Sequence, residues 1–231
     1  MLLQCRNLGF QYPGSSVQVI NNLSFTLEGP GLYAAFGPSG VGKTSFARIL
    51  AGQLAPNQGE VISNALHTIL YSYNLERLPG WASVGKILRQ VTPTPKQELL
   101  DELIDLFQVG HLLGNRFAQL SLGQQNRINL LRYLVQEFDL LILDESLANV
   151  DEKLRQEILL HIKALFSEKI FLSISHNLLE VAKFCKEILV LGAGPTTAGN
   201  THLLRGLDLQ GEGLANKEEL DTIMLEIMNA C

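Results

Sequence analysis

The sequence predicts an α/β fold with a largely parallel sheet. Two patterns favour this class: short apolar runs alternate with helical patterns along most of the chain, and three helical patterns follow one another between Trp81 and Glu137. The 231 residues, of which 46% are hydrophobic, suit one large domain or a domain with a small subdomain. This composition excludes a disordered chain, a collagen-like repeat and a disulfide scaffold.

Charge and cysteine content exclude further classes of protein. The chain carries 18 basic and 23 acidic side chains, a net charge of −5, so we expect no nucleic-acid partner. Cys5, Cys185 and Cys231 show no metal-ligand spacing, which fits a reducing compartment. No apolar run approaches the roughly 20 residues of a spanning helix, and the first residues do not resemble a signal peptide. We expect a protein that is cytosolic or is held at a membrane by partners.

Short runs of apolar and β-branched residues are the predicted strands. They lie at Leu2 to Leu8, Val17 to Leu27, Gly31 to Phe36, Gly59 to Ser63, Thr68 to Tyr71, Leu140 to Leu143, Ile170 to Ser175 and Glu187 to Leu191. The predicted helices cover Lys43 to Leu50, Ser83 to Val91, Pro95 to Phe107, Gly123 to Glu137 and Asn216 to Met228. The middle three form a helical insertion, and the last follows a turn at Gly192 to Gly199.

A phosphate-binding loop follows the strand that ends at Phe36. The run from Gly37 to Thr44 reads Gly-Pro-Ser-Gly-Val-Gly-Lys-Thr, the P-loop pattern, and a helix begins at Lys43. Small residues let backbone N–H groups turn around a phosphate, and the helix N-terminus adds its positive end. A glycine turn with a solvated lysine is the alternative, but a chance match occurs roughly once in a hundred such chains. The residues of this loop predicted to bind ATP are Gly37, Ser39, Gly40, Gly42, Lys43, Thr44 and Ser45.

A buried strand pattern ends in two carboxylates, Asp144 and Glu145. Beside a P-loop, the first carboxylate is placed to act through Mg²⁺, together with the Thr44 hydroxyl, and the second to deprotonate the attacking water. A solvated Asp-Glu pair at a strand end is the alternative for this segment alone. Together with the P-loop, the pair indicates a nucleoside triphosphatase.

The run from Gln119 to Arg127 reads Gln-Leu-Ser-Leu-Gly-Gln-Gln-Asn-Arg. It resembles the Leu-Ser-Gly-Gly-Gln signature of the ATP-binding subunits of ABC transporters. The resemblance implies a P-loop NTPase (RecA-like) core with an antiparallel β subdomain and a helical insertion that carries the signature. It also implies that Ser121, Gly123 and Gln124 bind ATP, whereas an ordinary serine-capped helix is the alternative for this segment alone.

Three other positions match the family in the expected order. Tyr12 resembles the aromatic residue that stacks on adenine, and His176 resembles the histidine that contacts the γ-phosphate. Asp151 matches the loop that crosses the dimer interface in the family, and the resemblance places it among the ATP-binding residues. The alternatives are a core tyrosine, a capping or packing histidine, and a helix N-cap.

Two positions depart from the family pattern. Leu122 stands where the signature usually has glycine, and Asn74 stands closest to the place of a glutamine that reaches Mg²⁺. The asparagine side chain is one methylene shorter than that of glutamine. Slower or differently coupled hydrolysis is therefore expected, and a cassette with weak turnover is an alternative.

The resemblance also implies the organisation of the chain and its partners. We expect one ABC ATPase domain over residues 1–200, a helical subdomain over about 75–137 and a helical tail over 201–231. Two copies would hold two Mg²⁺-ATP between them at the cytoplasmic face of the cell membrane, with a transmembrane permease and a solute-binding protein as partners.

The loop from Glu76 to Trp81 is similar to that of importers for nitrate, sulfonate and taurine. This loop would border the groove for the permease, although Trp81 in the core is the alternative. A short ABC-type ATPase of a cell-division or lipoprotein-export complex is the alternative function.

Overall fold

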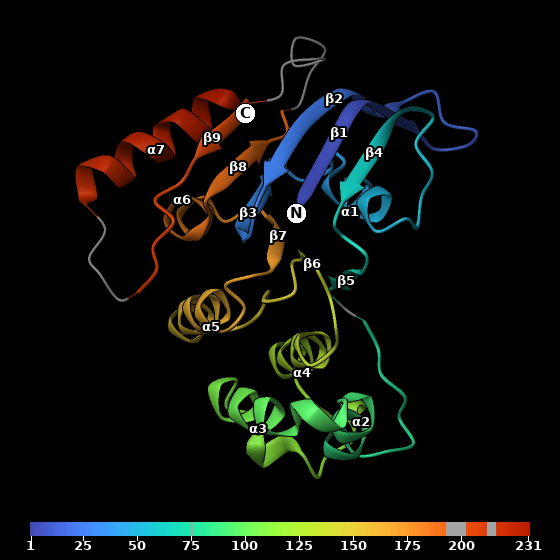
Figure 1. Ribbon diagram of the computed structural model, residues 1–231, viewed down its shortest axis with the longest axis vertical. Coiled ribbons are helices and arrows are strands. Elements are labelled where there is room, and N and C mark those ends of the chain that lie inside the picture. Colours follow the sequence, from blue (N-terminus) through green and yellow to red (C-terminus); the bar gives the residue numbers. More distant parts are fainter. Residues whose placement is uncertain (75, 193–201, 212–215) are drawn as a thin grey trace.

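Two sheets form the scaffold of the computed structural model, which describes residues 1–74, 76–192, 202–211 and 216–231 (Figure 1). An antiparallel sheet has the order β2-β1-β4 and a larger sheet has the order β5-β6-β7-β3-β8-β9. The first consists of β1 (Leu2–Gln11), β2 (Gln18–Glu28) and β4 (Gln58–Asn64). The second consists of β3 (Gly31–Phe36), β5 (Ile69–Tyr73), β6 (Leu140–Asp144), β7 (Ile170–Ser175), β8 (Glu187–Val190) and β9 (His202–Arg205).

The parallel strands of the larger sheet end at a common edge. Tyr73 pairs with Asp144, and Asp144 pairs with Ile174 of β7. Phe36, the last residue of β3, pairs with Ser175, the last residue of β7. Ligands of open α/β sheets bind outside the carboxyl ends of the strands. The fold therefore gathers the segments that follow β3, β5, β6 and β7, each of which carries predicted site residues.

Each face of the larger sheet buries an apolar core. Between the two sheets lies α1 (Lys43–Leu50), whose Phe46 packs with residues of both sheets. Other helices cover the opposite face: α5 (Glu152–Leu165), α6 (Leu178–Phe184) and α7 (Lys217–Ala230). Since α7 packs against α6 and β9, the C-terminal helix is part of the main body.

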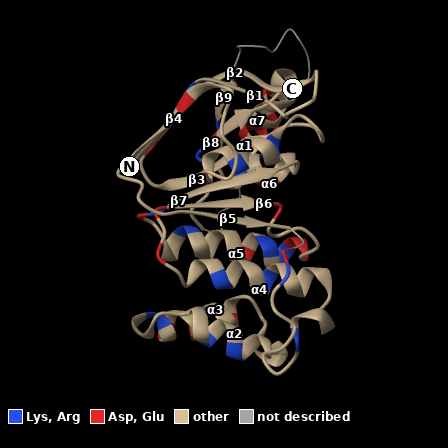
Figure 2. Ribbon diagram, turned by 90° about the vertical axis from the view of Figure 1, so that its right-hand side faces the viewer, with Lys and Arg blue, Asp and Glu red and all other residues tan. Residues whose placement is uncertain are grey.

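The predicted helical insertion is confirmed. It contains α2 (Val84–Val91), α3 (Gln97–Leu106) and α4 (Leu122–Leu134). Figure 2 shows α2 and α3 farthest from the sheets, with α4 between them and the larger sheet. Short 3₁₀ turns at Thr94–Lys96, Gly110–Leu112 and Phe117–Gln119 connect these helices. The helix that carries Ser121 at its start is thus joined to the core of the larger sheet.

Several elements differ from the predicted ranges. The strand β9 has no predicted counterpart, because its sequence His-Leu-Leu-Arg lacks β-branched residues; pairing with β8 stabilises it at the sheet edge. This strand lies within residues 201–231, the segment predicted as a helical tail. The predicted domain boundary at residue 200 stays a prediction. The predicted turn at Gly192 to Gly199 lies almost wholly outside the described residues. Within the described part of the chain, no helix is long and apolar enough to cross a bilayer.

Candidate nucleotide-binding site

The P-loop of residues 37–42 connects β3 to α1 and depends on glycine at several positions. Gly40 and Gly42 have φ of 85° and 103°, a backbone region that favours glycine. A Cβ on Gly42 would lie 2.7 Å from the side chain of Val19, and one on Gly37 would lie 2.3 Å from the carbonyl oxygen of Leu191. The loop therefore runs tightly between β2 and the end of β8. Ser39, next to Gly40, is exposed on the loop.

Lys43 lies inside the loop rather than in solvent. Its side chain is buried, and Nζ donates to the carbonyl oxygens of Gly37 at 2.7 Å and Pro38 at 2.8 Å. Burial lowers the pKa of the Lys43 ammonium, and the nearby carboxylates of Glu145 and Asp144 raise it in opposition. The cation is thus held among the backbone groups of the loop, and the alternative of a lysine in solvent is excluded.

Tyr12 and Ser45 are in contact. The Tyr12 hydroxyl lies 2.9 Å from Oγ of Ser45, on the first turn of α1. Ser45 is buried, whereas Tyr12 is 38% exposed beside the loop, with its ring edge-on to Phe10. An exposed ring next to the P-loop suits a stacking role for Tyr12, which stays a prediction.

Asp144 is a buried carboxylate at the end of β6. The Tyr71 hydroxyl donates to Oδ2 at 2.7 Å, and the Thr44 hydroxyl also hydrogen-bonds to the carboxylate. Burial raises the pKa of Asp144, while these two hydrogen bonds lower it in opposition. The bond to Thr44 joins the end of β6 to the first turn of α1.

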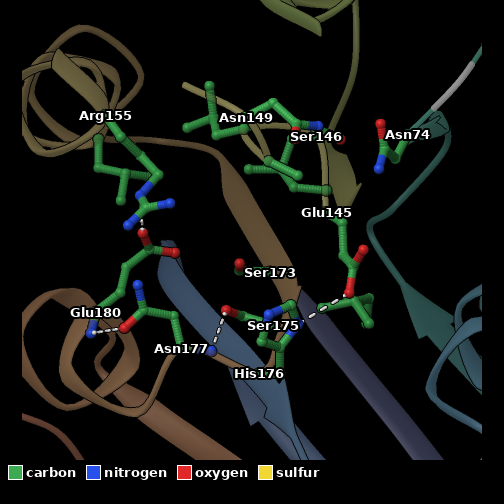
Figure 3. Close-up of a pocket in the computed structure, with 15 residues that line it drawn as sticks. Asn74, Glu145, Ser146, Asn149, Arg155, Ser173, Ser175, His176, Asn177 and Glu180 are labelled. Carbon is green, nitrogen blue, oxygen red and sulfur yellow. Dashed lines mark hydrogen bonds and ion pairs between the residues drawn. The ribbon is translucent and has the colours of Figure 1, made fainter. Parts of the chain in front are cut away.

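Glu145 and His176 form the exposed part of the site. Oε1 of Glu145 lies 3.0 Å from Nδ1 of His176, which follows β7 (Figure 3). Glu145 has a φ of 52°, a left-handed conformation that is uncommon for a residue with a side chain. This turn directs the glutamate across the strand ends towards the histidine. The two side chains are 39% and 67% exposed, so water can reach both.

Asn74 follows β5 and faces the same region. Its backbone N–H donates to the carbonyl oxygen of Asp144 at 3.0 Å. Its side-chain Oδ1 is buried and has no hydrogen-bond partner among the described residues. An unpaired buried oxygen is costly unless it binds a further group. The amide oxygen of Asn74, the hydroxyl of Thr44 and the carboxylate of Asp144 are all oxygen ligands of the kind that fits Mg²⁺.

A cavity of about 390 Å³ opens beside the Glu145 and His176 pair. Figure 3 shows an ion pair on its other side, where Nε of Arg155 lies 2.6 Å from Oε2 of Glu180. Burial raises the pKa of Glu180, and the charge of Arg155 opposes that rise. Serine, asparagine and aliphatic side chains of the segments after β5, β6 and β7 line the rest of the cavity.

The signature residues begin α4, as the sequence predicts. Oγ of Ser121 accepts from the backbone N–H of Gln124 at 3.4 Å, and Oε1 of Gln124 accepts from the N–H of Ser121 at 2.9 Å, which is a capping box. Leu122 is 49% exposed. A Cβ on Gly123 would lie 2.1 Å from the carbonyl oxygen of Asn149, so this glycine allows α4 to approach the segment after β6.

The family profile described as ABC transporter matches residues 20–148, more than half of the chain. The chain belongs to the ABC transporter family. This membership and the two-sheet architecture confirm the fold class that the signature predicts for an ABC ATPase.

Named relatives and solved structures agree with this assignment. The molybdenum import ATP-binding protein ModC of Brucella abortus (strain 2308) is 33% identical over 211 residues, 82% of this chain and 58% of the relative. The taurine import ATP-binding protein TauB of Pseudomonas fluorescens (strain Pf0-1) is 29% identical over 209 residues, 84% of this chain and 79% of the relative. The chain therefore spans little more than half of the ModC length.

A solved structure of a bacterial Atm1-family ABC exporter with ATP bound has a TM-score of 0.78. It is 21% identical, and the match covers 99% of this chain and 41% of the exporter chain. At this identity the likeness concerns the fold alone.

Most of the predicted site residues of this ABC chain fall into two groups. The P-loop, Asn74, Asp144, Glu145 and His176 lie at the carboxyl edge of the larger sheet. The signature stands on α4, which packs in the core opposite to that of α1 (Figure 1). Asp151 caps α5, with Oδ1 accepting from the N–H groups of Lys153 and Leu154 at 3.0 and 3.3 Å, so its N-cap role is confirmed. Its interface role stays a prediction.

Tyr71 is the site residue that the motifs of the ABC family do not reveal. It lies on β5, and its bond to Asp144 joins residues 73 positions apart. The sequence shows a tyrosine on a predicted strand, but the pairing of β5 with β6 appears only in the folded sheet. The ion pair of Arg155 and Glu180 is likewise not predicted, because it joins two helices, α5 and α6, that come together only in the folded chain.

Proposed function

We propose that the protein binds and hydrolyses ATP and thereby energises the import of a small solute through a transmembrane permease. The observation that carries this proposal is the Glu145 and His176 pair at the strand ends beside the P-loop. A carboxylate that is reached by water and oriented by a histidine fits a general base. The import function of relatives such as ModC and TauB favours an importer.

The residues divide the chemistry among them. The loop amides and Lys43 bind the β- and γ-phosphates, and the exposed ring of Tyr12 stacks on the adenine. Asp144, Thr44 and Asn74 hold Mg²⁺, which neutralises charge on the phosphates when bound. Glu145 orients the attacking water and takes its proton. Nδ1 of His176 lies 3.0 Å from Oε1 of Glu145 and orients this carboxylate. His176 would also contact the γ-phosphate.

We further infer that two copies act together. Ser121 and the helix end behind it are anion-binding groups that lie apart from the P-loop of their own chain. A second copy supplies them to this P-loop, and ATP joins the two subunits. Asp151 lies at that interface.

The permease docks near the loop that precedes α2. Trp81 in this loop is 72% exposed, which excludes the alternative of a core tryptophan. A large exposed aromatic side chain is typical of a binding surface. The protein would then be peripheral at the cytoplasmic face of the membrane and work with a solute-binding protein, as in importers for nitrate, sulfonate or taurine.

The test is Glu145→Gln, with Glu168→Gln as a control for the same change at an exposed position. We expect Glu145→Gln to bind Mg²⁺-ATP with wild-type affinity and to lose at least about a hundredfold in turnover. Light scattering should show it as a dimer with ATP and a monomer without. Wild-type turnover in Glu145→Gln would refute the assigned base, and a monomer at millimolar ATP would refute the dimer.

A further inference from the structure

The carboxylate of Glu76 is held by side chains of a single helix, α4. The Glu76 side chain is 15% exposed, and Oε1 lies 2.5 Å from Nη2 of Arg132. The Tyr133 hydroxyl lies within hydrogen-bond distance of both carboxylate oxygens, at 3.0 and 2.9 Å. The Asn129 amide donates to the backbone carbonyl oxygen of Glu76 at 2.8 Å. Both the side chain and the backbone of this loop residue are therefore fixed to α4.

The three donors form one prearranged face of the helix. Asn129, Arg132 and Tyr133 are three and four residues apart, which places them side by side on α4. The guanidinium of Arg132 lies 4.4 Å from the centroid of the Tyr133 ring, so each supports the orientation of the other. The Arg132 side chain is 17% exposed. An ion pair this buried is stabilising only if its geometry is good and further hydrogen bonds satisfy its polar atoms. Glu76 therefore follows α4 when the helix moves.

The loop is fixed to the nucleotide site two residues earlier. The N–H of Asn74 donates to the carbonyl oxygen of Asp144 at 3.0 Å. Consecutive Cα atoms are about 3.8 Å apart, so the Cα atoms of Asn74 and Glu76 can separate by no more than about 7 Å. The two anchored residues, Asn74 and Glu76, are therefore close along the chain and close in space.

The first half of α4 contacts the segment on the other side of Glu145. Nδ2 of Asn126 donates to the carbonyl oxygen of Ala148 at 2.6 Å. Gly123 lies against the backbone of Asn149, the next residue of that segment. Hence α4 contacts both the segment after β5, which begins with Asn74, and the segment after β6, which begins with Glu145.

We propose that Glu76 is a positioning residue, which keeps Asn74 beside Asp144 and Glu145 by fixing it to α4. The inference rests on the proposed function, because its consequence is a change in turnover at that site. In Glu76→Gln the charge that pairs with Arg132 is lost, whereas the bond from Asn129 to the backbone of residue 76 remains. The attachment of this loop to α4 is then weaker, and Asn74 is held less firmly. Glu76 acts through Asn74 and does not itself take part in the chemistry.

A double-mutant cycle between Glu76→Gln and Asn74→Ala tests this route. We expect Glu76→Gln to lower kcat at least about fivefold in the wild type but less than about twofold in the Asn74→Ala background. The Kd for ATP should stay within about twofold, because the P-loop is unchanged. Equal losses of kcat in the two backgrounds would overturn the proposal, since they would show that Glu76 acts independently of Asn74.

Hydrogen exchange provides a readout that needs no turnover. The amide of Asn74 should exchange about tenfold faster in Glu76→Gln, because its bond to Asp144 loses support. Glu137→Gln is the matched control: this carboxylate is 75% exposed, pairs with Lys96 at 2.9 Å, and should leave the exchange unchanged.

Tyr133→Phe removes one hydrogen bond and keeps the charge pair, so it serves if Glu76→Gln does not fold. We expect a smaller increase in the exchange of the Asn74 amide in this variant. Unchanged exchange in every folded variant would refute the positioning role. Faster exchange in a protein that never hydrolyses ATP would support that role and refute only the proposed function.

Discussion

Replacement of Gly123 by alanine tests the contact between the signature helix and the segment after β6. The new Cβ would lie 2.1 Å from the carbonyl oxygen of Asn149 and 3.1 Å from its carbonyl carbon. The first distance is about 0.9 Å short of the 3.0 Å below which such contacts essentially do not occur. Both partners are backbone, and Asn149 already has a φ of 62°, so no flexible side chain can absorb the clash. The start of α4 must move by about 1 Å.

Overpacking of this kind costs about 1–3 kcal/mol. We therefore expect Gly123→Ala to lower the free energy of unfolding by about 2 kcal/mol and the Tm by about 4–8 °C in a chain of this size. Turnover of ATP should fall about ten- to a hundredfold, because a 1 Å displacement of a positioned group has effects of that order.

Thermal unfolding followed by circular dichroism measures the first effect, and phosphate release measures the second. Gly114→Ala is the matched control, since a Cβ there meets no atom within 4 Å and its φ lies outside the left-handed region. That variant should be unchanged or about 0.5 kcal/mol more stable. Equal Tm values for the two alanine variants would show that the contact at Asn149 is not tight and would refute the reasoning.

Two further predictions concern pH. Tyr71→Phe removes a hydrogen bond that lowers the pKa of Asp144, so that pKa rises further and the acid limb of kcat/KM should move to higher pH; an unmoved limb would contradict the role of Tyr71. Two backbone N–H groups, of His67 and Thr68, lower the pKa of Asp139, so its carboxylate stabilises the fold above pH ~4 and less as pH falls through that lowered pKa. Urea unfolding of Asp139→Asn should therefore show a loss of unfolding free energy below about 1 kcal/mol that stays nearly constant from pH 7 to about pH 4 and shrinks below that pH. A loss that does not shrink below pH ~4 would argue against an electrostatic origin.

The sequence predicts those parts of the site whose signals are local. The P-loop lies within a dozen residues that include the end of a strand and the start of a helix, and the spacing of Ser121 and Gln124 is that of a capping box. Each of these patterns depends on backbone geometry within one segment. The structure accordingly shows the loop, the capped helix and the strand ending at Asp144 where they are predicted.

The remaining contacts depend on the order of the strands, which no local pattern encodes. Tyr71 reaches Asp144 because β5 pairs with β6. Glu76 reaches Arg132, 56 residues away, because α4 packs against the core of the larger sheet. The strand β9 forms through pairing with β8, although its own sequence has weak strand propensity. These features arise only when segments far apart in the sequence come together in the fold.

The internal bonds of Lys43 leave one donor of its ammonium for an incoming group. An ammonium has three N–H donors, and two of them go to carbonyl oxygens at 2.7 and 2.8 Å. A neutral acceptor offers no advantage over a carbonyl oxygen, whereas hydrogen bonds to charged oxygens are stronger by about a factor of two. Discrimination between a nucleoside and its polyphosphates is thus built into the lysine itself, and it does not depend on how well the base is recognised.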